Sequence, residues 1–500
     1  MGRTTTVISG VAWTIIQNII SILYGIVSVP FLINYFGKEE YGLIGLAISI
    51  NVYVQLLDMG MTNSNIKFFS EFMAKGDEDK VQRLFSLTSL FYIVIGVINT
   101  IVLFGFSFFV DACFRVTPDQ ALILRNLLWI LALNATLSWL SICYDEFLRA
   151  CELVSWIKKR VTVIKLLQFA ILLATILFSL SIEWYFFLYT FSATIILPLT
   201  LVKVKHVMPS LSIRCGFDKK MAQQVLPYAL SVFSFGIFQF LAFNFRPLFL
   251  GNMSGPSAVA DYNVMVTIAS VVTLISSSVM QVLLPTVTRM VVNDDTEAIN
   301  KVAFTGTKYI AIIISALVFY LVINISDIIQ LYVGDQFAHI STWMAIWLLT
   351  LLLSHRNVMS AFVFTQKKLT SVSLMGAIAM VLAISSYFVF IPKYGVGGVV
   401  IGFLLHELTH TVFYYVYFMP KKVKLNTFKI FTQGVLPTWV LLAITSICVC
   451  YASHLMNLGF WPNLIVKSLL YGTLSLIVLW FIVLNTEDKR YIVSLVKRSK

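Results

Sequence analysis

The sequence has few charged residues for its length. Of its 500 residues, 12% are charged, whereas 59% are hydrophobic. A soluble domain usually contains about a quarter charged residues. A soluble fold could not bury this much apolar surface, so the composition excludes a soluble globular protein and predicts an integral membrane protein.

Several signatures of metal sites, disulfide scaffolds and nucleotide-driven machines are also absent. The six cysteines show no ligand-like spacing, so neither a metal site nor a disulfide framework is expected. The sequence contains no Walker pattern, no glycine-rich phosphate loop and no nucleophile elbow. Energy for any transport would therefore come from an ion gradient, a substrate gradient or a partner, and no bound cofactor is expected.

Long apolar runs, separated by short polar breaks, fill most of the chain. About 20 apolar residues suffice for one membrane-spanning helix, and continuous runs of this length do not fit the alternating strands of a β-barrel. We therefore predict an all-α integral membrane protein with about 14 transmembrane helices. The candidate spans are approximately 7–36, 42–70, 84–112, 121–148, 161–181, 184–204, 225–250, 261–288, 302–331, 341–366, 369–392, 396–419, 432–454 and 463–485.

The basic residues are distributed unevenly between the two sides of these spans. With the N-terminus inside, 29 of the 36 Lys and Arg residues fall in inner loops and helix ends, five on the outer side and two within spans. Basic residues concentrate on the cytoplasmic side of membrane proteins, so both termini are predicted to be cytoplasmic. This asymmetry also explains the net charge of +13 without a nucleic-acid partner.

The two halves of the chain share a pattern of loops and turns. The matched pairs are Pro30 with Pro247, Tyr41 with Tyr262, and Asp77 with Asp294. An offset of six helices preserves orientation, so the repeat is parallel. We predict two six-helix lobes, 1–204 and 225–419, joined by a cytoplasmic linker at 205–224 and followed by two additional helices and a basic tail at 420–500.

Acidic residues precede the third and ninth predicted spans. They are Asp77 and Glu78 in one turn and Asp294 and Asp295 in the other. Asp is a favoured N-cap residue, and negative charge is stabilising at a helix N-terminus. We expect both turns to have this structural role.

The N-terminal region resembles a known family. The run FGKEEYGLIGLAISINVYVQLLDMGMTNSNIKFF has a Phe-Gly-x-x-x-Tyr-Gly turn followed by Leu-x-Asp-x-Gly, and a later EFLRACELVSWIKKR follows the fourth span. These segments resemble the polysaccharide biosynthesis proteins of Wzx type, which belong to the multidrug/oligosaccharidyl-lipid/polysaccharide exporter superfamily. The matching residues are Phe36, Gly37, Tyr41, Gly42, Asp58, Gly60, Leu148, Arg149 and Ala150. Many relatives have a basic residue in the first span, where this chain has Gln17 and Asn18.

The resemblance implies a flippase in the bacterial inner membrane. Such a protein moves oligosaccharides linked to undecaprenyl pyrophosphate, by alternating access, for synthesis of O-antigen, lipopolysaccharide, capsule or exopolysaccharide. Its partners would be this lipid-linked substrate, membrane lipid, a polysaccharide polymerase and a chain-length regulator. The resemblance leaves open whether protons or sodium drive transport. An alternative within the superfamily is a MATE-like exporter of small organic cations.

Four of the charged residues inside predicted spans stand out. They are Asp58, Arg246, Arg356 and Glu407. A charge at the bilayer centre costs about 2.5–3.5 kcal/mol on insertion scales, so such residues either pair with each other or line a polar cavity. Arg offers two parallel donors to phosphate oxygens, which makes Arg356 and then Arg246 candidates for a pyrophosphate headgroup. Arg246 lies near the outer end of its span, where snorkelling to the interface is the alternative.

A polar stripe interrupts the second predicted span. Asp58, Thr62, Asn65 and Lys67 lie within it, and the first three fall on one side of a helix. They are candidates for binding sugar hydroxyls, and Asp58 also for ion coupling. Hydrogen bonding between helices is the alternative, and Gly60 is expected to permit close packing.

The twelfth span contains HELTH, which matches the zinc motif His-Glu-x-x-His. His406 and His410 would share a helix face, with Glu407 as general base. An intramembrane metalloprotease also needs a third ligand, and the only later aspartate is Asp488 in the tail. We therefore predict no metal and treat His406, Glu407 and His410 as ion-coupling candidates, with the protease as a remote alternative.

Overall fold

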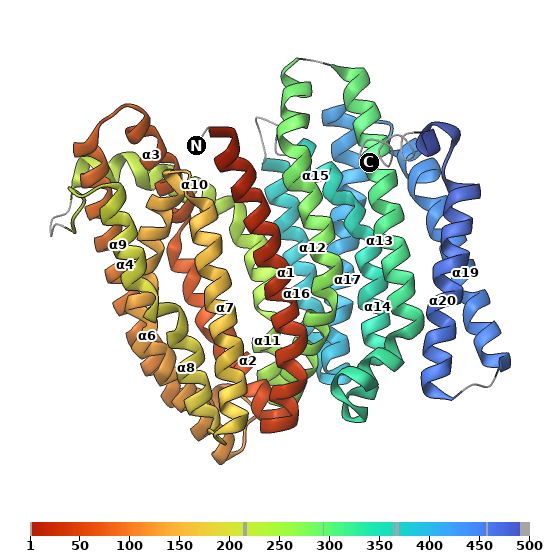
Figure 1. Ribbon diagram of the computed structural model, residues 1–500, viewed down its shortest axis with the longest axis horizontal. Coiled ribbons are helices and arrows are strands. Elements are labelled where there is room, and N and C mark those ends of the chain that lie inside the picture. Colours follow the sequence, from red (N-terminus) through yellow and green to blue (C-terminus); the bar gives the residue numbers. More distant parts are fainter. Residues whose placement is uncertain are drawn as a thin grey trace. The chain divides into compact units, whose positions relative to one another are not determined.

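The computed structural model describes residues 3–213, 218–293, 295–363, 365, 370–456 and 459–490. Nearly all of these residues are helical, and no strand occurs among them (Figure 1). The chain divides into two compact units, Met1–Thr267 and Ile268–Lys500.

Thirteen helical segments in the described residues are long and apolar enough to cross a membrane. They coincide with thirteen of the fourteen spans expected from the sequence, so the all-α membrane fold is confirmed. The other expected span, 225–250, falls on α10 (Lys219–Asn244) and α11 (Arg246–Ser254), where several side chains lie outside the described part of the chain.

The first unit contains α1 to α11 and the start of α12. Within it, α4 packs along α6, and α1 packs along α7 (Figure 1). The remaining elements are α1 (Arg3–Phe36), α2 (Lys38–Val54), η1 (Gln55–Asp58), α3 (Met61–Ala74), α4 (Glu78–Phe106), η2 (Ser107–Phe109), α5 (Val110–Cys113), α6 (Pro118–Ala150), α7 (Val154–Leu177), α8 (Ile182–Ile195), α9 (Leu197–Val207) and α12 (Pro256–Val292).

The second unit contains the rest of α12 and all later helices. Within it, α16 packs along α17, and α13 contacts α14, α19 and α20. Its elements are α13 (Thr296–Val333), η3 (Asp335–Ile340), α14 (Ser341–Leu351), η4 (Leu352–Arg356), α15 (Asn357–Val363), α16 (Thr370–Tyr394), α17 (Val396–Val412), η5 (Phe413–Val423), α18 (Thr427–Lys429), η6 (Ile430–Val435), α19 (Leu436–Met456), α20 (Phe460–Val478) and η7 (Leu479–Val483).

Matching caps occur in the two halves of the sequence. Gly37 precedes α2 with φ 98° and Gly255 precedes α12 with φ 81°, a region that favours glycine. Asp77 accepts a hydrogen bond from the backbone N–H of Lys80 at the start of α4, and Asp295 caps α13 in the same way. The capping predicted for Asp77 and Asp295 is confirmed, whereas Asp294 lies outside the described residues. The matching glycine and aspartate positions support the internal duplication. The boundaries of the two lobes stay a prediction.

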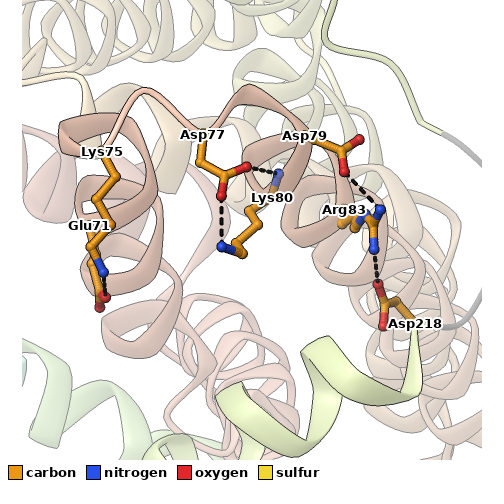
Figure 2. Close-up of polar contacts among 7 residues, drawn as sticks. All are labelled: Glu71, Lys75, Asp77, Asp79, Lys80, Arg83 and Asp218. Carbon is orange, nitrogen blue, oxygen red and sulfur yellow. Dashed lines mark hydrogen bonds and ion pairs between the residues drawn. The ribbon is translucent and has the colours of Figure 1, made fainter.

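Charged side chains surround the turn between α3 and α4 (Figure 2). Lys75 pairs with Glu71, Lys80 with Asp77, and Arg83 with Asp79. The Lys80 ammonium and backbone N–H, which both donate to Asp77, lower the pKa of that carboxyl. These pairs lie at the surface, where ion pairs contribute little to stability. The turn is structural, as expected from the sequence.

The second predicted span is not one continuous helix. The helix ends at Asp58, Met59 and Gly60 both have left-handed backbone angles, and α3 begins at Met61. A side chain on Gly60 would place its Cβ 2.4 Å from the carbonyl oxygen of Ala229. The expected close packing at Gly60 is confirmed, and the break redirects the chain beside a polar site.

Replacing this glycine should destabilise the protein. Gly60→Ala would incur about 1–2 kcal/mol for the left-handed backbone, plus the clash with Ala229. Thermal unfolding in detergent should show a clearly lower melting temperature for this variant than for the wild type. Gly105→Ala is the matched control, because Gly105 is helical and has no atom within 4 Å of an added Cβ. Equal melting temperatures for the two variants would contradict this account of the break.

Candidate functional site

A cavity of about 590 Å³ lies inside the first unit. Small-molecule sites commonly measure about 300–1,000 Å³. Helices α2, α3, α4, α6, α7, α8 and α10 and the turn η1 all contribute to its wall. The break after Asp58 matters here, because Asp58 and Thr62, on either side of it, both line the cavity.

Amide, hydroxyl and aromatic side chains dominate the wall of this cavity. An amide offers both donors and acceptors, as sugar hydroxyls require, and Trp139 offers an apolar ring face. None of the described lining residues is Lys or Arg, and the one carboxylate is Asp58. The polar and aromatic lining residues are Asn51, Gln55, Asp58, Thr62, Asn99, Asn134, Ser138, Trp139, Gln168, Phe186, Tyr189, Thr190 and Phe240.

Hydrogen bonds connect the cavity wall to a buried carboxyl behind it. Asp58 accepts from the Thr62 hydroxyl (3.0 Å) and the Tyr92 hydroxyl (2.8 Å). The Tyr92 oxygen lies 2.5 Å from Glu146 Oε1, and Asn65 donates to Glu146 Oε2 at 2.9 Å. Asp58, Thr62 and Asn65, predicted together from their spacing, therefore belong to one network.

Sequence reasoning missed Glu146 and Tyr92. Glu146 is 1% exposed and lies near the end of α6, inside the predicted fourth span. A carboxyl within a span was a usable signal, although Asp145 beside it gave no means of choosing between the two. The structure distinguishes them, because Asp145 pairs with Arg160 at 2.5 Å.

Lys67 lies away from the cavity. Its side chain is exposed, and its ammonium lies 3.7 Å from the centroid of the Tyr228 ring. This is a cation–π contact. The structure therefore does not bring Lys67 together with Asp58, Thr62 and Asn65.

Lys165 is a cation within a span that sequence reasoning also missed. Its ammonium donates to Gln168 Oε1 at 2.9 Å and lies 5.0 Å from the centroid of the Tyr24 ring. Within the described part of the chain it has no acidic partner. Gln168 lines the cavity, so this unneutralised charge lies next to the cavity wall.

A second cavity of about 280 Å³ adjoins the first. Ile48 and Tyr189 line both. Its wall includes Tyr24, Tyr41 and Tyr185, so hydroxyls and ring faces continue from one cavity to the next. Together they form an extended polar and aromatic tract, with Lys165 in contact with residues from both.

Arg246 begins α11 and is 3% exposed. Its guanidinium lies 4.5 Å from the centroid of the Phe243 ring. The side chain is thus buried against protein instead of extending to the interface, but it lines neither cavity.

Arg356, in the second unit, forms an ion pair with Glu407. Arg356 ends η4, which interrupts the tenth span, and its Nη2 lies 2.8 Å from Glu407 Oε2. Glu407 is 5% exposed. The structure therefore joins two of the four charged residues singled out within the spans, and each neutralises the other.

The HELTH segment lies on α17. His406 and His410 lie one turn apart, with ring centroids 4.7 Å apart and ring planes inclined at 51°, while Glu407 points to Arg356. Among the described residues, no three His, Cys, Asp or Glu side chains are arranged to hold a metal ion. The ion-coupling role of these two histidines stays a prediction.

Removing one partner of the Arg356–Glu407 pair should be more damaging than removing both. A single Arg356→Met or Glu407→Met change leaves a buried unpaired charge and should lower the free energy of unfolding by about 3–5 kcal/mol. The double variant should recover most of this lost stability. Thermal unfolding of the three purified variants measures this. A double variant as unstable as the sum of the singles would show that the two charges act independently.

The fold resembles those of solved membrane transporters. The lipid II flippase MurJ, in an inward closed conformation, matches with a TM-score of 0.70 and 13% identity, covering 95% of this chain and all of that one. An inward-facing MATE family multidrug transporter of the MOP superfamily gives 0.62 at 13% identity, covering 80% of this chain and 93% of that one. The MATE multidrug transporter DinF-BH matches with a TM-score of 0.61 and 15% identity, covering 85% of this chain and 96% of that one. At these identities the likeness establishes the fold.

At the sequence level, no curated protein matches the chain. The sequence pattern that defines the family described as "Polysaccharide biosynthesis protein", however, matches residues 7–291, more than half of the chain. The resemblance seen in the N-terminal motifs is confirmed, and the chain belongs to the polysaccharide biosynthesis protein family.

Proposed function

We propose that the protein is a flippase that moves lipid-linked oligosaccharides across the bacterial inner membrane, with both termini in the cytoplasm. The observation that carries the proposal is the cavity of the first unit, whose wall combines amides, hydroxyls and Trp139. Such a wall suits the hydroxyls and apolar faces of sugars. Family membership and the transporter fold point to the same class of substrate.

The proposed transport cycle is alternating access by two six-helix lobes, 1–204 and 225–419. The internal duplication and the fold shared with transporters support it. The proposed lipid carrier is undecaprenyl pyrophosphate, and the product would feed a polymerase and a chain-length regulator for O-antigen, capsule or exopolysaccharide.

Lys165 is the basic residue best placed for an anionic group of this substrate. It has no carboxylate partner among the described residues and contacts Gln168 and Tyr24 of the two cavities. Arg356 remains a proposed headgroup ligand, although it would have to exchange Glu407 for a phosphate oxygen. Arg246 remains a second candidate.

A MATE-like exporter of organic cations is the second candidate function. One observation favours it: among the described residues of the cavity wall, the only charged one is Asp58, a carboxylate. Under this alternative, Lys165 would oppose substrate binding, and removing its charge would leave activity intact or raise it.

Deletion of the gene separates the two functions. We expect the surface polysaccharide to be lost, while complete repeat units accumulate on undecaprenyl pyrophosphate at the inner leaflet. Mass spectrometry of lipid-linked glycans and surface-polymer analysis measure this. Unchanged polysaccharide with new sensitivity to cationic drugs would instead establish the exporter.

Complementation of the deletion tests the cavity and its charge. Trp139→Ala and Lys165→Met should each lower surface polysaccharide at least tenfold, the effect of losing about 1.4 kcal/mol of substrate binding, while Lys165→Arg should retain most of it. Lys67→Met is the matched control, because Lys67 lies on the surface away from the cavity. Full activity of Lys165→Met would exclude the proposed anion contact.

A further inference from the structure

The network behind the cavity contains fewer hydroxyl protons than its contacts require. The Tyr92 oxygen lies 2.8 Å from Asp58 Oδ1 and 2.5 Å from Glu146 Oε1. A phenol has a single proton to donate, and ionised carboxylates only accept. Two separate hydrogen bonds this short at one phenol oxygen require that one of the two carboxyls carries a proton.

The surroundings identify Glu146 as the protonated group. Glu146 is 1% exposed, and no basic residue pairs with it among the described residues. It lies near the C-terminal end of α6 (Pro118–Ala150), where a negative charge is disfavoured. Burying an unpaired carboxylate is costly, and such a group becomes neutral instead.

Asp58 has the opposite environment. It lines the cavity and accepts three hydrogen bonds, from the backbone N–H and hydroxyl of Thr62 and from Tyr92. It also lies two residues before Gly60, the N-cap of α3 (Met61–Ala74), and a helix N-terminus favours negative charge. Asp58 is therefore the anion of the pair.

The other hydrogen bonds agree with a neutral Glu146 and an ionised Asp58. The Thr88 hydroxyl donates to Asn65 Oδ1, so the Asn65 amide donates to Glu146 Oε2. Glu146 Oε2 is then the carbonyl oxygen, and Oε1 carries the proton that is donated to Tyr92. Every donor from Thr88 to Asp58 has an acceptor.

Among the described residues, no further charged group interacts with Glu146. The titratable groups facing Glu146 are Asp58 of η1, Tyr92 of α4 and Cys143 of its own helix. From α3, Thr62 and Asn65 contact the network, and neither is ionisable. Helices α2, α7, α8 and α9 also pack against α6, but no described charged side chain on them interacts with Glu146.

We propose that Glu146 is a proton-binding site and that Tyr92 relays its proton to Asp58 at the cavity wall. In the relay, Glu146 gives its proton to the Tyr92 oxygen while Tyr92 gives its own to Asp58. Glu146 becomes the anion, Asp58 the acid, and Tyr92 is unchanged. The cavity can then release or take up the proton at Asp58.

The relay makes the proton the coupling ion of transport, a consequence that rests on the proposed function. After the pair loses its proton, two carboxylates face one phenol, and their repulsion separates α6 from the break between η1 and α3. Because both elements line the cavity, loss of the proton changes the shape of the substrate site.

Infrared difference spectroscopy on the purified protein tests the proton site without any glycan. At neutral pH the wild type should show the C=O stretch of a buried carboxylic acid, and Glu146→Gln should lose it. Glutamine can replace the protonated acid, donating to Tyr92 and accepting from Asn65, so this variant should fold. Asp145→Asn is the matched control and should keep the band, because Asp145 is paired with Arg160.

Proteoliposomes then test coupling. A pH gradient should accelerate translocation of lipid-linked oligosaccharide by the wild type, and this acceleration should be lost in Glu146→Gln and Tyr92→Phe. A spectrum unchanged by Glu146→Gln, or acceleration by sodium alone, would overturn the proposal. If the band is present but no glycan is moved, the flippase assignment fails and the proton site stands.

Discussion

The fold of the first unit depends on how the backbone N–H and C=O groups at the break in the second span find hydrogen-bond partners inside a membrane. A helix that ends in hydrocarbon leaves N–H and C=O groups without partners, and each costs several kcal/mol. Here Asp58 accepts from the backbone N–H of Thr62, and Gly60 and Met59 adopt the backbone angles that the turn requires. The same carboxylate faces the cavity. The same carboxylate therefore both stabilises the break and contributes to the polar wall of the cavity.

Charge in the spans is handled in two ways. Arg356 with Glu407, and Arg160 with Asp145, are neutralised by an opposite charge within hydrogen-bonding distance. Glu146 and Lys165 have no such partner among the described residues and lie beside the cavities. Paired charges hold helices together, whereas an unpaired charge beside a cavity is available to a proton or a ligand.

The sequence predicted the all-α membrane fold well, because long apolar runs report directly on the bilayer. It also predicted the grouping of Asp58, Thr62 and Asn65, since helical spacing survives the short break at Gly60. It could not identify Glu146 or Tyr92 as their partners, because those contacts depend on how α3, α4 and α6 pack. Similarly, nothing in the spacing showed that Arg356 meets Glu407, which lies 51 residues away.

The central claim is that this cavity belongs to a transporter of lipid-linked sugars. The most direct measurement is translocation by the purified protein in liposomes, using an oligosaccharide on undecaprenyl pyrophosphate and a membrane-impermeant enzyme that trims only glycans on the outer leaflet. The account predicts that the protein makes the inner-leaflet glycans accessible to this enzyme, with no such effect in protein-free vesicles. Retention of those glycans in the inner leaflet, together with uptake of an organic cation by the same vesicles, would contradict it.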